Sequence, residues 1–215
     1  MTGRSRLFEM RRMEALSNTI FGVAMTLLAY QVPKEKFATT DPKWGDILQS
    51  YGSHLLALLL SFVVAGMFWY SHQRRLAYAP EARRVEVLVN LLFLLSVIVL
   101  PVTTALYGNY NDSAAVTALY GFNLALMSIL NAILWVIAAA AQRDRLATVT
   151  PVFSMVIFIV AAILAVLAPQ FAKFVWPLGF LSPILAAYLE RGQAASTAAS
   201  DRLKRKPGHP ASDPR

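Results

Sequence analysis

Long apolar blocks separated by short polar segments dominate this sequence of 215 residues. Each block holds about 20 residues with few charges, the length that an α-helix needs to cross about 30 Å of hydrocarbon. Helices are expected because lipid offers no partners for backbone polar groups, and a helix satisfies its own. The pattern predicts an all-α polytopic membrane protein with six transmembrane helices, at 13–32, 53–72, 86–106, 114–141, 149–168 and 171–189.

Proline marks the connection between the last two predicted helices. Only Ala168, Pro169 and Gln170 separate them, and proline disrupts a helix interior, so we expect a tight hairpin there. Pro177 and Pro183 would kink the sixth segment. If that segment were re-entrant instead of crossing, the C-terminus would lie outside.

Basic residues in the connections indicate the orientation. Of the 20 Lys and Arg residues, sixteen lie on one side of the predicted bundle. The four on the other side are Lys34, Lys36, Lys43 and Lys173. Lys and Arg in short loops resist translocation and remain in the cytoplasm. The bias predicts an even number of crossings with both termini cytoplasmic, and it disfavours a re-entrant sixth segment.

A single six-helix transmembrane domain, residues 13–189, is predicted between two cytoplasmic ends. Residues 1–12 form a basic N-terminus, and the apolar block after them lacks a small-residue cleavage site, so we interpret it as a retained helix. Residues 190–215 have almost no bulky apolar side chain and are predicted to be a disordered basic tail. The expected location is the cell inner (plasma) membrane, as a multi-pass protein.

Composition narrows the partners and the chemistry. The net charge is +8, and the basic residues lie at the edges of the apolar blocks. We therefore expect membrane lipids as partners and no nucleic acid. The chain has no cysteine and three histidines, and it lacks zinc-protease and phosphate-loop motifs, so we expect no enzyme activity, no cofactor and no metal site. No carboxylate falls at mid-membrane, which disfavours a proton- or sodium-coupled carrier.

Uncharged polar residues do fall inside the predicted helices, where interhelical hydrogen bonds are the simplest interpretation. They include Ser61, Asn90, Ser96, Asn123, Ser128 and Asn131. In the first helix, Thr19, Val23, Thr26 and Tyr30 recur at spacings of four, three and four, so they share one stripe. This mildly polar stripe suits either a close helix contact or the wall of a narrow water path, and spacing alone favours the helix contact.

Three stretches in the first half carry a family resemblance. They are RMEALSN at Arg12 to Asn18, which continues into TIFGVAMTLL; FWYSH at Phe68 to His72; and NLLFLLSVIVLP at Asn90 to Pro101. In this order and at this spacing they resemble the transmembrane protein 175 family of potassium-permeable channels. The resemblance covers roughly residues 10–105.

The resemblance implies a homotetramer around a central pore that the first helix lines. Such a pore conducts potassium and other monovalent cations without a carbonyl filter loop. The resemblance would place Val23 and Leu27 at a hydrophobic constriction, where a ring of apolar side chains can gate by dewetting. Thr19 and Thr26 would line the pore, and Tyr30 would lie toward its outer mouth. A passive, potassium-permeable cation channel is therefore the leading hypothesis.

One motif departs from the family pattern of Arg, three residues, then Phe-Ser-Asp. This chain has Leu16, Ser17 and Asn18 at the last three places, so the aromatic ring and the carboxylate are replaced. The resemblance implies a gating or structural network of Arg12, Ser17, Asn18 and His72, with Arg12 or Asn18 as the partner of His72. The missing carboxylate keeps a second hypothesis open, a non-conducting membrane scaffold or sensor with the channel fold. A third hypothesis, a coupled small-molecule exporter, is disfavoured because no carboxylate falls at mid-membrane.

Overall fold

Every regular element in the described part of this computed structural model is helical. The structure describes residues 3–31, 41–78, 84–110, 112–143, 146–181, 184, 187–188 and 191–192. The helices are α1 (Gly3–Tyr30), α2 (Trp44–Tyr78), α3 (Arg84–Asn109), α4 (Ala114–Gln142), α5 (Val149–Leu167) and α6 (Pro169–Val175). Two short 3-10 helices are η1 (Leu146–Thr148) and η2 (Trp176–Phe180).

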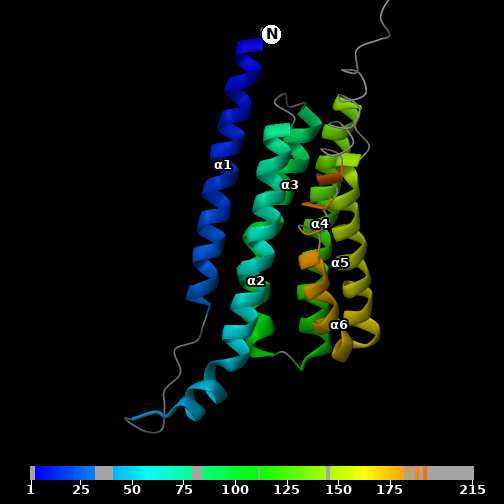
Figure 1. Cartoon of the computed structure of the whole chain (residues 1–215). Coiled ribbons are helices and arrows are strands. Elements are labelled where there is room, and N and C mark those ends of the chain that lie inside the picture. The colour runs from blue at the N-terminus through cyan, green and yellow to red at the C-terminus, as the bar shows by residue number, and fades with distance from the viewer. Residues whose placement is uncertain are drawn as a thin grey trace, which may run out of the picture.

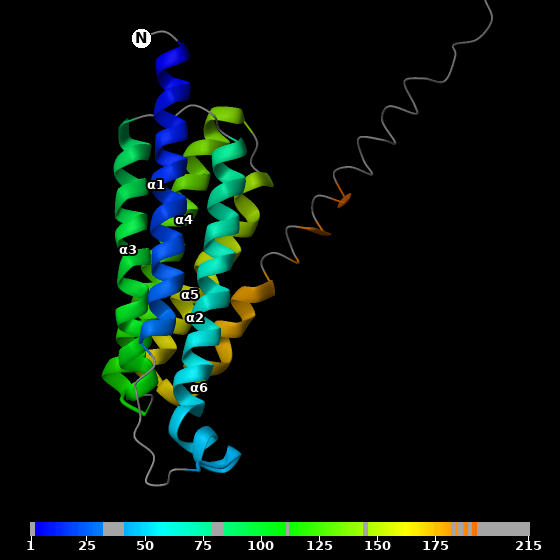
Figure 2. The ribbon, with the colours of Figure 1, turned by 90° about the vertical axis from the view of Figure 1, so that its left-hand side faces the viewer.

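The long helices run side by side as a bundle (Figure 1). α4 packs against both α3 and α5 and is the central element. α1 packs on α2 and α3. Figure 2 shows α1 lying over these two helices at one face of the bundle, with no other described helix on its outer side. The first helix therefore presents one face to the bundle and another away from it.

Four of the described helical stretches are long and apolar enough to cross a membrane. They are Trp44–Tyr78, Arg84–Asn109, Ala114–Gln142 and Leu146–Leu167, which match the second to fifth predicted helices. α1 begins with a charged half, and α6 has 7 residues, so neither is among the four. The all-helical, multi-pass architecture is confirmed, whereas six crossings and two cytoplasmic termini stay predictions.

The predicted hairpin after the fifth helix is present. α5 ends at Leu167 and Pro169 lies in the first turn of α6, where its missing N–H costs no hydrogen bond. α6 then returns along α5 (Figure 1). The predicted sixth segment, 171–189, changes to the 3-10 helix η2 at Trp176, and several of its last residues lie outside the described ranges. The predicted tail also lies outside them, except for residues 191–192.

An aromatic side chain holds the returning segment in the core. Trp176 is fully buried, and its ring meets Tyr120 of α4 edge-on, with centroids 4.8 Å apart. The same ring meets Tyr107 of α3 at 5.2 Å, and Tyr107 stacks on Tyr120 at 5.2 Å. Edge-to-face contacts of this kind stabilise a core beyond the area that they bury. The start of the sixth segment is thus anchored against α3 and α4.

Polar side chains inside the bundle do bond between helices, as predicted, at several positions. Ser61 Oγ of α2 lies 2.9 Å from the Tyr120 hydroxyl of α4 and 2.8 Å from Thr104 Oγ1 of α3. Asn123 Nδ2 donates to Thr103 Oγ1, and Asn131 Nδ2 donates to Ser71 Oγ.

For two serines the prediction was wrong. Ser96 donates to the Phe93 carbonyl oxygen at 2.6 Å, and Ser128 donates to the Ala125 carbonyl oxygen at 2.8 Å. Both hydroxyls therefore bond within their own helix. A serine can satisfy its hydroxyl on the carbonyl of the preceding turn without any help from a neighbouring helix.

Candidate functional site

The bundle-facing side of α1 is a narrow apolar seam that contains one hydroxyl. Met13, Ser17, Phe21, Ala24 and Leu28 recur at spacings of three or four and are all buried. Phe21 lies 5.9 Å from Phe93 of α3 between ring centroids, so the seam packs into the groove between α2 and α3. This seam fixes which side of α1 points away from the bundle.

The outward side of α1 carries the predicted stripe. Val23 is 53% exposed, Leu27 is 41% exposed and Tyr30 is 82% exposed. Thr19 and Thr26 are exposed as well, and their hydroxyls donate back to the carbonyl oxygens of Ala15 at 2.9 Å and Gly22 at 2.8 Å. Because each hydroxyl proton is used within the helix, the threonine oxygens present lone pairs outward. An oxygen of this kind can face a cation.

Polar side chains fasten the middle of α1 to α2. His72 Nε2 lies 3.0 Å from Ser17 Oγ, within hydrogen-bond distance, and the Ser17 hydroxyl donates to the Met13 carbonyl oxygen at 2.8 Å. Trp69 Nε1 donates to Asn18 Oδ1 at 3.0 Å, and Gln73 Nε2 donates to the same oxygen. Adjacent residues on α1 thus bond to side chains one turn apart on α2.

These contacts correct part of the prediction. The structure brings Ser17, Asn18 and His72 together, but His72 bonds to Ser17 and not to Arg12 or Asn18. Asn18 bonds to Trp69 and to Gln73. Arg12 has an exposed side chain further toward the start of α1. Within the described residues, no group of three His, Asp or Glu side chains is placed to hold a metal ion.

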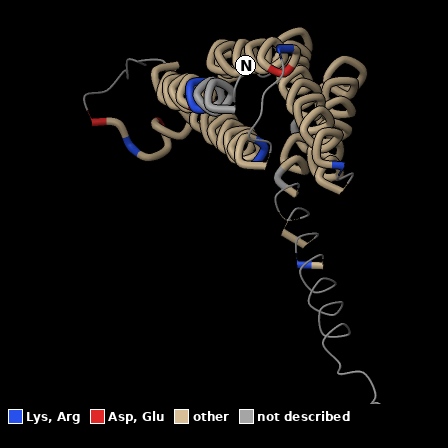
Figure 3. Tube along the Cα trace, turned by 90° about the horizontal axis from the view of Figure 1, so that it is seen from above, with Lys and Arg blue, Asp and Glu red and all other residues tan. Residues whose placement is uncertain are grey.

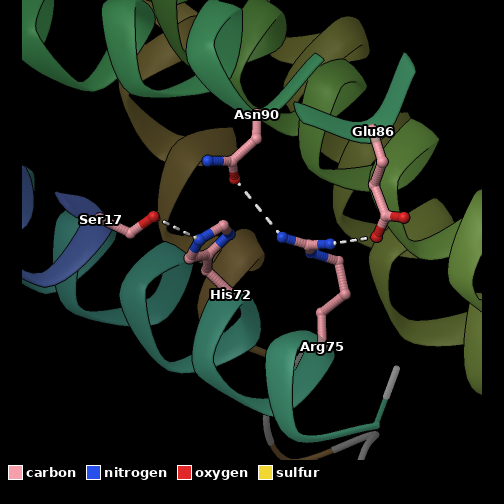
Figure 4. A network of polar contacts seen from close by, with 5 residues as sticks. All are labelled: Ser17, His72, Arg75, Glu86 and Asn90. Atoms are coloured by element: carbon pink, nitrogen blue, oxygen red, sulfur yellow. Dashed lines mark hydrogen bonds and ion pairs between the residues drawn. The ribbon is translucent and has the colours of Figure 1, made fainter. Parts of the chain in front are cut away.

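A buried ion pair near this network was missed by sequence reasoning. Arg75 is fully buried, and its Nη1 donates to Glu86 Oε1 at 2.7 Å (Figure 4). Its Nη2 donates to Asn90 Oδ1 at 3.4 Å. The charge pattern had counted Arg75 with the cytoplasmic loops. The available signal was spacing, because Phe68, His72 and Arg75 recur at four and three residues and so share one face of α2.

Comparisons with known proteins agree on one family. The family model described as "Endosomal/lysosomal potassium channel TMEM175" matches residues 12–101. A protein of Chamaesiphon minutus named as a potassium channel is 31% identical over 63% of this chain and 68% of its own length. One of Streptomyces collinus, also named as a potassium channel, is 28% identical over 59% of this chain, and the match spans 63% of that relative, less than two thirds.

The fold has a solved counterpart. A crystal structure of a lysosomal potassium-selective channel TMEM175 homolog from Chamaesiphon minutus superposes with a TM-score of 0.71. It covers 82% of this chain and 97% of its own, at 22% sequence identity. The match of fold therefore extends beyond the residues that the family model covers. The chain belongs to the TMEM175 family.

Proposed function

We propose that this chain is the subunit of a potassium-permeable cation channel, a homotetramer in the cell inner membrane with α1 of each copy lining the pore. The observation that carries the proposal is the outward stripe of α1, which no described part of the chain covers although it lies on a helix packed against a membrane-type bundle. Membership of the TMEM175 family and relatives named as potassium channels support the choice of ion.

The chemistry of the stripe suits passive conduction. Val23 and Leu27 from several copies would form a ring of apolar side chains narrow enough to exclude water when closed. Thr19 and Thr26 would offer oxygens to a passing cation, and Tyr30 would lie near the outer mouth. None of these groups holds a formal charge, so an ion would meet weak sites and leave them readily, as conduction requires.

The basic residues support an orientation with six crossings and both ends in the cytoplasm. In the described part, Arg11, Arg12, Arg74, Arg84 and Arg143 lie near the start of α1, the end of α2, the start of α3 and the end of α4. These four ends share the end of the bundle where α1 begins (Figure 1). Seen from that end, basic residues mark the near ends of several helices (Figure 3). Positive charge gathered at one end favours placing it inside.

A non-conducting scaffold is the alternative that one observation favours. Asn18 accepts two hydrogen bonds from α2, yet it carries no charge. Charge-assisted bonds are about twice as strong as neutral ones, so a carboxylate at this place would hold α1 more tightly. A chain with the weaker fastening could keep the fold and lose regulated opening.

Potassium flux in liposomes separates the two functions, with Asn18→Asp as the companion variant. We expect the purified oligomer to carry potassium well above empty liposomes. Asn18→Asp keeps both acceptor bonds and adds a negative charge, so we expect its flux to differ from the native flux severalfold. Asn18→Ala, which loses both bonds, serves as the matched control. Folded oligomers of the native chain and of Asn18→Asp that both conduct no better than empty liposomes would contradict the channel and favour the scaffold.

A further inference from the structure

Ser17 on α1 favours one protonation pattern of His72. The one hydroxyl proton of Ser17 goes to the Met13 carbonyl oxygen, so Ser17 can only accept from the imidazole. His72 Nε2 therefore carries a proton, and in the neutral ring Nδ1 is a bare acceptor. Nδ1 is buried and has no hydrogen-bond partner in the described part of the chain.

The guanidinium of Arg75 lies on the other side of the imidazole. Figure 4 shows the His72 ring between the Ser17 hydroxyl and Arg75. Arg75 cannot move away easily, because α3 holds it at two points, Glu86 Oε1 at 2.7 Å and Asn90 Oδ1 at 3.4 Å. Arg75 Nε, a donor, is likewise buried without a partner in the described residues. Arg75 Nε can donate a hydrogen bond and His72 Nδ1 can accept one, so the two unpaired groups suit each other chemically.

Aromatic rings clamp the imidazole in this orientation. His72 stacks on Phe93 of α3 with centroids 5.3 Å apart and planes 26° apart. Phe21 of α1 lies against it at 6.1 Å. In this orientation Nε2 faces the Ser17 hydroxyl of α1, and the opposite side of the ring faces the Arg75 guanidinium of α2 (Figure 4). Only the location of the proton is left to be decided.

We propose that Arg75 is the positioning residue for His72: held by Glu86 and Asn90 of α3, its guanidinium keeps the imidazole in the tautomer that donates from Nε2 to Ser17. A proton on Nδ1 would point an N–H at a cation, whereas a lone pair there is attracted to it. The ion pair thereby couples the start of α3 to α1 through one imidazole. The effect on conduction rests on the proposed function, but the tautomer does not.

Nitrogen NMR of the full-length oligomer in lipid, labelled with 15N-histidine, tests the tautomer directly. The chain has three histidines, and His54→Gln and His209→Gln assign the His72 signals by elimination. The native protein should show one His72 species protonated at Nε2 alone. Arg75→Gln should add a second species protonated at Nδ1, and Arg75→Lys, which keeps a cation, should restore a single species. Arg74→Gln removes the same charge one residue earlier and should change nothing.

A second variant guards against misfolding of Arg75→Gln. The paired Arg75→Met/Glu86→Met change removes both charges together and leaves no unpaired ion in the core. It should show the same second species at His72. An unchanged single Nε2-protonated species in both Arg75→Gln and the paired variant would overturn the proposal, because Ser17 alone would then fix the tautomer.

Flux measurements test the coupling to α1. Arg75→Gln should change potassium flux severalfold, and the same change in a Ser17→Ala background should have no further effect, because its path to α1 is already removed. Additive effects of Ser17→Ala and Arg75→Gln would contradict the coupling. If no variant conducts but the tautomer responds as described, the channel proposal fails and the positioning role of Arg75 stands.

Discussion

Replacing Val23 or Leu27 by alanine is expected to raise potassium flux through the reconstituted oligomer by about tenfold. Each substitution widens a ring of apolar side chains and makes it easier to wet. A barrier lowered by about 1.4 kcal/mol is enough for a tenfold change in rate. Flux through liposomes at matched protein content, or single-channel recording, measures the change.

Leu59→Ala is the matched control for this prediction. Leu59 is 60% exposed, but it lies on the outer side of α2 and not on the stripe of α1. Its truncation also removes an exposed leucine from a membrane-type helix, and flux should stay at the native level. If Val23→Ala and Leu27→Ala both leave flux unchanged while the oligomer stays intact, these two residues do not form the constriction.

Glu86→Ala should destabilise the folded protein by about 3–5 kcal/mol, the cost of leaving one partner of a buried ion pair uncompensated. Both side chains are almost fully buried, at 0% exposure for Arg75 and 3% for Glu86. The change leaves a cation in the core next to Asn90 and His72 with its main counter-charge gone. The midpoint of unfolding in detergent, followed by denaturant titration, measures the loss.

The paired Arg75→Met/Glu86→Met variant separates the cost of an orphaned charge from the worth of the pair. Replacing a buried ion pair by apolar side chains of similar volume is often neutral or stabilising. We therefore expect the paired variant to unfold close to the native midpoint. If it is as unstable as Glu86→Ala, the pair itself contributes most of the stability, and the desolvation argument is wrong for this site.

The positions of the helices could be predicted from the sequence because a bilayer requires each crossing segment to be apolar and to satisfy its own backbone hydrogen bonds. Blocks of apolar residues long enough to span a bilayer predicted the second to fifth helices, and Pro169 predicted the hairpin after the fifth. Helix ends were less accurate. α2 runs over Trp44–Tyr78, well beyond the predicted 53–72, because polar residues outside the hydrocarbon can continue a helix that the apolar core began.

The roles of side chains near the end of α2 could be assigned only from the packed structure. Arg74 and Arg75 are adjacent and equivalent in any count of charge. In the structure, Arg74 lies 5.8 Å from the ring centre of Tyr70, while Arg75 is buried against Glu86. A shift of one residue turns a helical side chain by about 100°, so burial separates neighbours that composition cannot. The same reason hid the bond from Trp69 to Asn18.

The stripe of α1 was predicted from spacing, and its role came from the resemblance. The periodic placement of Thr19, Val23, Thr26 and Tyr30 indicated one face, and the structure leaves that face exposed. Spacing alone favoured a contact between helices. A pattern of threonine and valine does not distinguish a face packed against a helix from a face that lines a water path. What the stripe faces in the proposed oligomer depends on how the copies pack, which the pattern of one sequence does not specify.

Accessibility of single cysteines along α1 tests the pore-lining claim most directly, since the native chain has none. A cationic, water-soluble methanethiosulfonate should modify Val23→Cys and Thr26→Cys and reduce their potassium flux. It should leave Ala24→Cys, on the bundle-facing seam, and Leu59→Cys, on the outer side of α2, unmodified. Val23→Cys and Thr26→Cys that resist the reagent as fully as Leu59→Cys would contradict the account, because the stripe would then face lipid.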